Sequence, residues 1–367
     1  MRIRAAITLL AGMAIAVVAP LLGLLAAGQS VDGYLAFPPR TQAVAHAPFE
    51  WGAFLLLSIP ALGALGLYLV ALLRAAKQPS AYRTGAFPWW GWLGLALIAT
   101  GWILAWTEGL VPPGWRRQTF TPLWLGYTLT MNALALRATG HSPLTHRPAW
   151  FLALFPASAA FWWLFEYLNQ FVHSWYYTGT HARSDWDYFM QATLPFSTVL
   201  PAIASTLAWL RQFPRIEALA LPPIGVNRVL AWLALATGIA VLAAMGVSPE
   251  RFFAALWMGP PLVLCGLQQI ILGETLLAPL ARGDWRPLLQ PAVAALVCGL
   301  FWEMWNYGAL AQWHYSIPYA QRFQIFEMPL LGYAGYVPFG VMCALVLDLV
   351  AWIVERRGLY FRELRAR

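Results

Sequence analysis

About ten apolar segments, each close to 20 residues long, follow one another along the chain and are separated by short polar connections. A helix needs about 20 apolar residues to cross a bilayer, and its backbone polar groups must be hydrogen-bonded within the segment. The sequence therefore predicts an all-α, polytopic membrane protein. The expected transmembrane helices cover residues 5–27, 51–73, 89–107, 121–138, 149–173, 192–211, 226–246, 256–278, 288–310 and 331–353.

The composition agrees with this class. A chain of 367 residues that is 60% hydrophobic and 10% charged has too few polar groups to cover a surface that faces water. The net charge of +8 comes from short basic clusters between apolar segments, which indicates membrane topology and no nucleic-acid partner. The cysteines Cys265, Cys298 and Cys343 lie inside apolar segments, without the spacing of a disulfide framework or a metal site.

The second half of the chain repeats the first at an offset of 137 positions. This offset separates Glu166 from Glu303 (303 − 166) and Asn169 from Asn306. A Trp-x-Tyr element follows each Glu-x-x-Asn pair, and a shift of one position between its two copies indicates an insertion in a loop. These elements are Trp175 with Tyr177 and Trp313 with Tyr315.

The duplication divides the chain into three parts. We expect a two-helix extension over residues 1–84, a first membrane repeat over 85–221, and a second over 222–367 that ends in a basic cytoplasmic tail. Four helices per repeat is an even number, so both copies enter the membrane in the same direction as a parallel repeat. The apolar run after Arg2 and Arg4 is longer than the roughly 7–15 residues of a secretory signal, which favours a retained helix; a cleaved signal is the alternative.

Basic residues predict the orientation. Seventeen of the 23 Lys and Arg residues fall on the side of the N-terminus, and such an excess marks the cytoplasmic side. We therefore expect a multi-pass protein of the plasma (inner) membrane, with both termini cytoplasmic and both Glu-x-x-Asn pairs near the outer face. The six basic residues on the outer side are Arg40, Arg116, Arg117, Arg183, Arg251 and Arg322.

Acids and amides inside apolar helices are costly to bury, so they indicate a functional site. Glu166, Asn169 and His173 are spaced to share one helical face, whereas the second copy has no equivalent histidine. Glu327 has Met190 as its counterpart, so only the second copy has gained a further acid. The alternative is structural: the acids and amides join helices by hydrogen bonds, and the aromatic residues form an interfacial belt.

The candidate site lies where the third helices of the two repeats are expected to approach each other about a pseudo-twofold axis. The candidate catalytic residues are Glu303, Glu327 and Glu166, and the candidate substrate-binding residues are Asn169, Asn306, His173, Trp175, Tyr177, Trp302, Trp305, Trp313 and Tyr315. No metal site is predicted, because no Glu-x-x-His pair is present. The only residues suited to ligate a metal ion are Glu166, His173, His181, Glu303, His314 and Glu327. No cofactor is assigned.

Glu303 and Glu327, if they lie close together, would raise the pKa of one carboxyl group and leave an acid that can give a proton near neutral pH. Ring faces of neighbouring Trp and Tyr residues can stabilise a cation. An acid in an aromatic box suits protonation of an alkene or of a lipid head group. It equally suits a structural cluster of hydrogen bonds.

The run Trp313-x-Tyr315-x-x-Pro318, followed by Phe326-Glu327-Met328-Pro329-Leu330, is similar in layout to the membrane domains of lycopene cyclases and carotenoid hydratases. Those domains are also duplicated helical units with a Trp-x-Tyr element before a Pro-and-Glu motif. The likeness departs after Pro329, where that family has paired acids and this chain continues with Leu330-Leu331-Gly332. The resemblance implies an isoprenoid substrate, with Glu303 and Glu327 as proton donors.

Together these patterns predict an integral membrane protein that binds or acts on a lipidic or isoprenoid substrate at the outer leaflet, with membrane lipid as its partner. The alternatives are a transporter and a non-catalytic subunit of a larger membrane complex, which would have protein partners.

Overall fold

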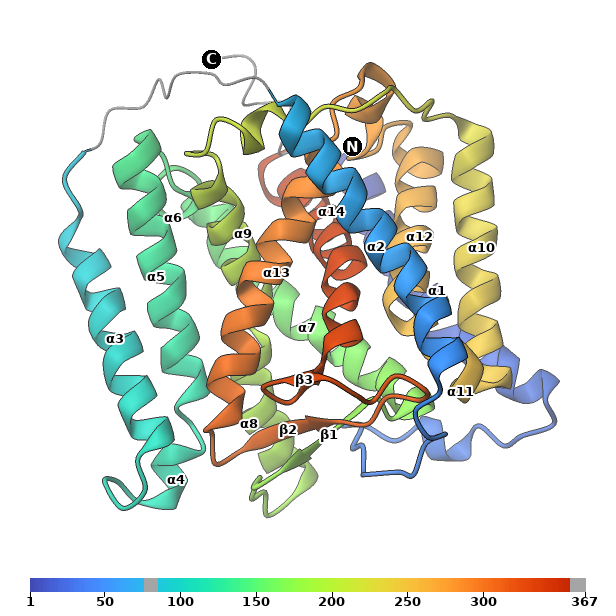
Figure 1. Ribbon diagram of the computed structural model, residues 1–367, viewed down its shortest axis with the longest axis horizontal. Coiled ribbons are helices and arrows are strands. Elements are labelled where there is room, and N and C mark those ends of the chain that lie inside the picture. Colours follow the sequence, from blue (N-terminus) through green and yellow to red (C-terminus); the bar gives the residue numbers. More distant parts are fainter. Residues whose placement is uncertain (76–84, 357–367) are drawn as a thin grey trace.

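In the computed structural model, which describes residues 1–75 and 85–356, long helices form a bundle that ends on one side in a short β-ribbon (Figure 1). Within these residues, nine helical segments are long and apolar enough to cross a membrane. The predicted all-α, polytopic membrane class is confirmed. The remaining predicted segment is the 20-residue helix α5, which is less apolar than the nine because it carries Asn132 and several threonines.

The long helices are α1 (Arg2–Ala26), α2 (Trp51–Arg74), α3 (Trp89–Trp106), α5 (Phe120–Thr139), α7 (Pro148–Val172), α8 (Asp185–Phe196), α9 (Val199–Leu210), α10 (Arg228–Val247), α12 (Ala255–Leu267), α13 (Arg286–Tyr307) and α14 (Tyr336–Glu355). The short helical turns are η1 (Asp32–Tyr34), α4 (Pro113–Arg116), α6 (Pro143–His146), η2 (Ile216–Ala218), α11 (Pro249–Phe252), η3 (Gln268–Leu272), η4 (Ala278–Arg282) and η5 (Leu330–Gly335). The strands are β1 (Trp175–Thr178), β2 (Gln312–Tyr315), β3 (Gln324–Ile325) and β4 (Met328–Pro329).

The helix predicted over 192–211 is two helices, α8 and α9. The segment begins early because Ser184 caps α8, where its side chain accepts a hydrogen bond from the backbone N–H of Asp187. The break falls before Pro201, whose ring cannot continue the hydrogen-bonded ladder of the preceding turn.

The helix predicted over 256–278 is also shorter than expected. It passes from α12 into one wide turn, η3, and ends at Leu272. Gly273 follows in the left-handed conformation (φ 76°), which glycine adopts without steric cost and which commonly terminates a helix.

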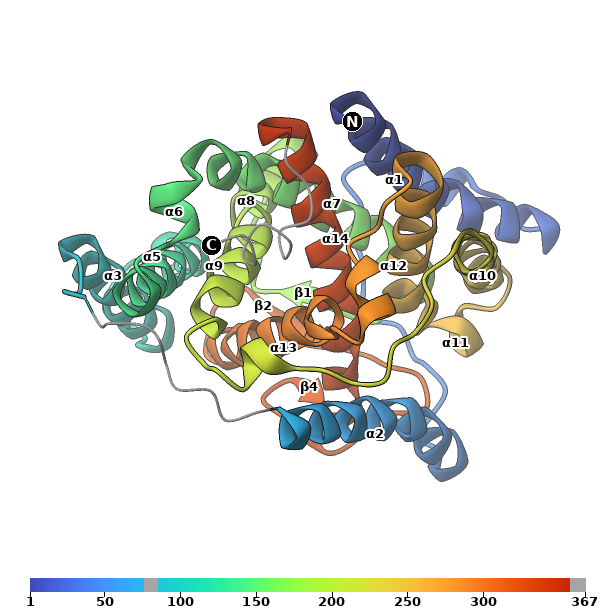
Figure 2. The same cartoon turned by 90° about the horizontal axis from the view of Figure 1, so that it is seen from above.

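The helix α14 lies at the centre of the bundle when it is seen from above (Figure 2). It packs against α1, α7, α9, α12 and α13. Two helix pairs flank this centre, α3 with α5 on one side and α10 with α12 on the other. These pairs are the first two segments of the two predicted repeats, while α2 lies at the periphery.

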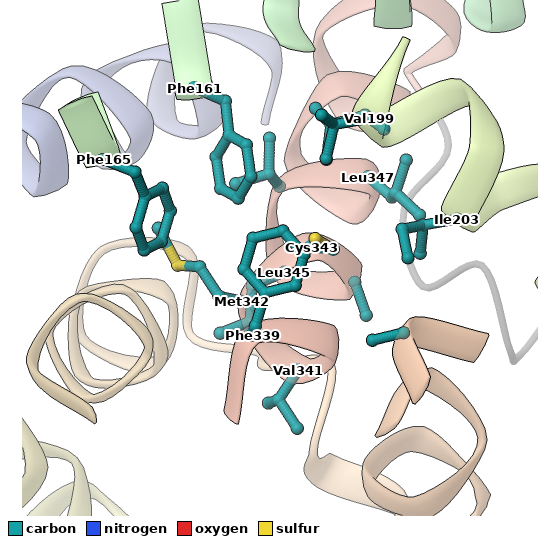
Figure 3. Close-up of a cluster of buried hydrophobic side chains, with 14 of the residues drawn as sticks. Phe161, Phe165, Val199, Ile203, Phe339, Val341, Met342, Cys343, Leu345 and Leu347 are labelled. Carbon is teal, nitrogen blue, oxygen red and sulfur yellow. The ribbon is translucent and has the colours of Figure 1, made fainter. Parts of the chain in front are cut away.

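The core around α14 is made of branched and aromatic side chains (Figure 3). Phe339 of α14 contacts Phe161 and Phe165 of α7, with ring centroids 5.9 Å and 5.6 Å apart. Val199 and Ile203 of α9 face the same helix. Both α7 and α13 pack on α9 and α14. The helices α9 and α14 therefore connect the halves of the chain.

The helix α1 packs closely on α10 through glycines. A Cβ atom at Gly23 would lie 2.0 Å from the carbonyl oxygen of Ala243, and one at Gly246 would lie 2.0 Å from that of Pro20. Small residues at such crossings allow helix backbones to approach in a membrane. The predicted first apolar segment is thus packed into the bundle.

The start of α1 and the end of α14 lie on the side of the bundle opposite the ribbon (Figure 1). Basic residues of the larger predicted group, such as Arg74, Arg147 and Arg286, stand at helix ends on this side. Other members of that group lie outside the described residues, namely Lys77, Arg83, Arg357, Arg362, Arg365 and Arg367.

Candidate functional site

The two Trp-x-Tyr elements, expected as loops, pair with each other as the antiparallel strands β1 and β2. Trp175 lies opposite Tyr315, and Tyr177 lies opposite Trp313. A rotation that exchanges the two strands therefore superposes Trp175 on Trp313 and Tyr177 on Tyr315. A local pseudo-twofold axis thus relates β1 to β2. The ribbon lies across the ends of α7 and α13 (Figure 1) and joins the two halves of the chain.

An asparagine at the end of each of these helices holds its own strand. Asn169 donates from Nδ2 to the carbonyl oxygen of Trp175 (2.7 Å) and accepts from the backbone N–H of Ser174 (2.8 Å). Asn306 makes both kinds of bond with the backbone of Trp313, at 2.7 Å and 2.8 Å. Both asparagines are fully buried, so each satisfies the strand's polar groups where water cannot. The candidate substrate-binding amides thus hold the backbone of the ribbon.

Glu166 is a hydrogen-bond acceptor for three aromatic side chains. Its Oε1 accepts from Tyr177 Oη (2.5 Å), Trp162 Nε1 (2.9 Å) and Trp175 Nε1 (3.1 Å). The side chain is only 1% exposed. A carboxylate accepts several donors at once, and such charge-assisted bonds are roughly twice as strong as neutral ones.

Glu303 has an equivalent but less complete set of partners. Its Oε1 accepts from Tyr315 Oη (2.8 Å) and Tyr336 Oη (2.8 Å), and Trp313 Nε1 donates to Tyr315 Oη (3.0 Å). Its Oε2 is buried and has no hydrogen-bond partner within residues 1–75 and 85–356. The second carboxyl group therefore retains an unused polar atom.

The tyrosines of the ribbon stay protonated. Burial raises the pKa of Tyr177 and Tyr315 well above the ordinary value, and the neighbouring Glu166 and Glu303 raise it further. Both phenols are therefore neutral donors at physiological pH.

A cavity of about 170 Å³ lies beneath the ribbon, between the halves of the chain. Trp162, Trp175 and Tyr177 line it from the first half, and Trp302, Trp313 and Tyr315 line it from the second. Trp257 and Tyr336 add further aromatic wall. Glu166 and Glu303 are not among the lining residues; they lie behind this wall and bind its polar atoms.

Glu327 is hydrogen-bonded to a different partner, His314. Its Oε2 is 2.9 Å from Nδ1 of His314, and Nε2 of His314 is 3.0 Å from Oγ1 of Thr178. Side chains alternate along a strand, so His314 points to the face of the ribbon opposite Trp313 and Tyr315. The structure thus places Glu327 beside His314, and no hydrogen bond joins it to Glu303 among the described residues.

His173 does not share the helical face of Glu166 and Asn169. The helix α7 ends at Val172, and His173 follows in the left-handed conformation (φ 45°). Burial and, second, the neighbouring His46 lower the pKa of its imidazole. His173 therefore belongs to the helix end and not to the cavity wall.

Trp302 and Trp305 divide between the cavity and the core. Trp302 lines the cavity and stacks on Tyr336, with ring centroids 6.0 Å apart. Trp305 is buried against Trp124 (5.1 Å), which Trp302 also contacts (4.9 Å), but Trp305 is not a lining residue.

The connection between α1 and α2 is joined to the outside of the ribbon. Ser316, next to β2, donates to the carbonyl oxygen of Val44 (3.2 Å), and His46 is 2.5 Å from Glu250. His46 also lies 3.3 Å from the carbonyl oxygen of His173. The predicted extension thus helps to hold the site.

Sequence reasoning missed several residues of the wall. Trp162 had a usable signal, because a residue four positions before Glu166 lies on the same helical face. Tyr336 and Trp257 come from other segments, and only the tertiary packing brings them to the cavity. Arg117 was assigned to an outer loop without a role, and its side chain also lines the cavity.

In the described part of the chain, no three His, Cys, Asp or Glu side chains gather in a way that could hold a metal ion. Comparisons of the chain with protein-family models, curated proteins and solved structures found no match. The many apolar helices and the Trp-rich cluster identify an integral membrane protein.

Proposed function

We propose that this protein binds the end of a lipidic, isoprenoid-type ligand in the aromatic cavity and acts on it by proton transfer. One observation carries the proposal: the cavity is walled by rings from both halves, and the hydroxyls of three of its four lining tyrosines are bonded to buried carboxyl groups. Ligand sites are typically apolar hollows with a few convergent polar groups.

The size of the cavity supports a ligand that enters by one end. Pockets for whole drug-sized molecules measure about 300–1,000 Å³. The cavity here is about 170 Å³, which suits a terminal group with the rest of the molecule in the membrane or at its surface. Five wall residues, Trp162, Trp175, Tyr177, Tyr315 and Tyr336, turn a polar atom to a carboxylate, so the wall offers mainly ring surface.

Glu303 is the better candidate for the proton donor. Its Oε1 accepts two donors, compared with three at Oε1 of Glu166, and its Oε2 is buried without a partner among the described residues. In the proposed step, the Tyr315 hydroxyl turns from Glu303 toward the ligand and gives its proton to an alkene as protonated Glu303 gives a proton to Tyr315 Oη, so that no free phenolate forms. A carboxylate and a cationic ligand result, and the ring faces stabilise the cation. Loss of a proton from the product to Glu303 restores the acid.

The proposed setting is the outer leaflet of the plasma membrane, with both termini in the cytoplasm. The excess of basic residues at the helix ends opposite the ribbon supports this orientation.

The test fills the cavity with a larger side chain and measures whether a lipid still co-purifies with the protein. Ala192 lines the cavity, whereas Met190 on the same helix is exposed. Ala192→Phe should abolish co-purification of an isoprenoid lipid, which mass spectrometry should detect with the wild type and with the control Met190→Phe. Equal lipid content in all three proteins would refute the proposal.

Action on the ligand is tested separately, by comparing cell lipids and pigments between wild type and Glu303→Gln. A protein that binds lipid but leaves identical lipid profiles would be a binding protein and not an enzyme.

A role as a subunit of a membrane complex is the second candidate. The helix α2 supports it, because most of its residues are exposed and Ala71 is its one buried residue. Stoichiometric partners that are lost when α2 is replaced by an unrelated apolar helix would favour this role over lipid chemistry.

A further inference from the structure

Arg117 is the one charged side chain that lines the cavity in the described part of the chain. It stands in the connection between α4 and α5, and Gln118 and Thr180 line the same region. The remaining wall is mainly aromatic and aliphatic. The cavity therefore combines an apolar interior with one cationic group.

The position of Arg117 is fixed by the ribbon. Its Nε donates to the carbonyl oxygen of Gly179 (2.9 Å), directly after β1. Gly179 has φ 67°, and a Cβ atom there would lie 1.8 Å from the carbonyl oxygen of Leu310. This bond leaves the terminal nitrogens of the guanidinium group for another acceptor.

Arg117 has no acidic partner among the described residues, in contrast to its neighbour. Arg116 donates to the carbonyl oxygen of Ala105 (3.1 Å) and lies 3.6 Å from Glu108. The adjacent arginines thus differ in their contacts. Arg116 binds residues at the end of α3 and in the connection to α4, and Arg117 lines the cavity.

The connection that carries Arg117 has the character of a membrane interface. Trp115 is 71% exposed and Leu110 is 56% exposed. Exposed Trp residues commonly lie at the level of the lipid head groups. A ligand whose chain end fills the cavity would therefore hold its head group close to Arg117.

We propose that the ligand is a phosphate-bearing amphiphile, with its apolar end among the rings and its phosphate on Arg117. This inference rests on the proposed function of the cavity as a lipid site. A guanidinium fork matches phosphate geometry with two parallel hydrogen bonds. The further phosphate oxygens can accept from Gln118 and Thr180, which line the same region.

The experiment measures binding of farnesyl phosphate, farnesol and inorganic phosphate to the purified full-length protein. Fluorescence of the wall tryptophans reports occupancy, and titration gives the affinities. Farnesyl phosphate should bind the wild type about tenfold more tightly than farnesol, as one charge-assisted interaction predicts. Inorganic phosphate at millimolar concentration should not displace it.

Variants assign the preference to one side chain. Arg117→Gln should bind both farnesyl compounds with the affinity that the wild type has for farnesol. Arg117→Lys keeps the charge but not the fork, so it should keep only part of the preference. The matched control Arg116→Gln should keep the preference. Unchanged melting temperatures would show that the variants fold.

Each contrary outcome has its own meaning. Equal affinities of the wild type for the two farnesyl compounds, or a preference that survives Arg117→Gln, would overturn the phosphate assignment and leave the lipid site standing. Displacement by inorganic phosphate would replace the amphiphile with a free phosphate ligand. Binding of neither farnesyl compound would remove the proposed function itself.

Discussion

The ring of Tyr336 lies directly over Gly299, where a Cβ atom would be 2.5 Å from its Cε2. At an offset of 137 positions, Gly299 corresponds to Trp162 (299 − 162) and Tyr336 corresponds to Val199 (336 − 199). Trp162 donates to Glu166, and Tyr336 donates to Glu303. Each half thus supplies an aromatic donor to its own glutamate, but from a different helix, and the missing side chain at Gly299 makes room for Tyr336.

Gly299→Ala should displace Tyr336 from Glu303. The lost bond and the steric conflict should destabilise the protein by about 1–3 kcal/mol, although alanine is the better helix former. Thermal unfolding of the purified protein measures the change. Gly63→Ala in α2 is the control, because no atom lies within 4 Å of its Cβ position. An unchanged melting temperature for Gly299→Ala would show that Tyr336 can move without cost.

Removing an asparagine at a helix end should release its strand. Asn169→Ala leaves a buried backbone N–H and a buried carbonyl oxygen without their partner, and Asn306→Ala does the same to a partly buried N–H and carbonyl oxygen. Each should cost about 3 kcal/mol, since one unsatisfied buried group costs about 1–3 kcal/mol. Asn227→Ala removes one exposed helix cap and should cost only about 1 kcal/mol. Equal losses in all three variants would contradict the role of the buried pair.

The halves of the chain should separate locally if Gly179 is replaced. Gly179→Ala puts a Cβ atom 1.8 Å from the carbonyl oxygen of Leu310, so the connections that follow β1 and precede β2 can no longer touch. Gly109→Ala is a matched control, because Gly109 has a similar φ of 76° and nothing within 4 Å. The control should lose about 1 kcal/mol from backbone strain alone. Hydrogen exchange of the β1 and β2 amides should rise in Gly179→Ala only.

The helices were predictable because membrane insertion imposes a length and a composition on each of them. Their ends were less so: the break between α8 and α9 and the early end of α12 depend on local features such as Pro201 and Gly273. The ribbon was missed because strands of four residues give almost no periodic signal and form here only by pairing two distant segments.

The candidate site was predictable in part. Glu166 and Glu303, which recur at the offset of 137 positions, indicated where to look, since polar groups inside apolar helices are costly unless they are paired or used. The sequence could not show that the carboxyl groups lie behind the wall, or that His314 binds Glu327 on the other face of the ribbon. Pairing of side chains across the fold decides such contacts, and spacing along the chain does not encode them.

The topology stays a prediction that reporters can test. A reporter inserted between Thr180 and Asp185 should be outside the cell, since this connection lies at the ribbon end of the bundle. One fused after Arg367, which lies outside the described residues, should be cytoplasmic. The positive-inside distribution is the physical reason. The opposite labelling would place the cavity on the cytoplasmic side and would contradict the outer-leaflet assignment.

Glu166→Gln and Glu303→Gln should differ in what they damage. Glutamine keeps the shape of the side chain and one accepting oxygen, and it removes the charge and the titratable proton. Glu166 accepts hydrogen bonds from three donors. Replacing these charge-assisted bonds by neutral ones in Glu166→Gln should lower the stability of the protein by about 1–3 kcal/mol. Glu303 accepts two, and its Oε2 already has no partner in the described residues, so we expect a smaller loss.

The loss of function should be greater for Glu303→Gln than for Glu166→Gln. If Glu303 is the proton donor, Glu303→Gln should fold, retain ligand and lose turnover, because binding is kept while the proton source is removed. Glu327→Gln tests the predicted second acid, which here binds His314. The surface control is Glu108→Gln, whose side chain is 88% exposed. Melting temperatures and lipid profiles of all four variants are compared with wild type. Equal destabilisation of Glu166→Gln and Glu303→Gln with wild-type lipid profiles would assign both acids to holding the ribbon.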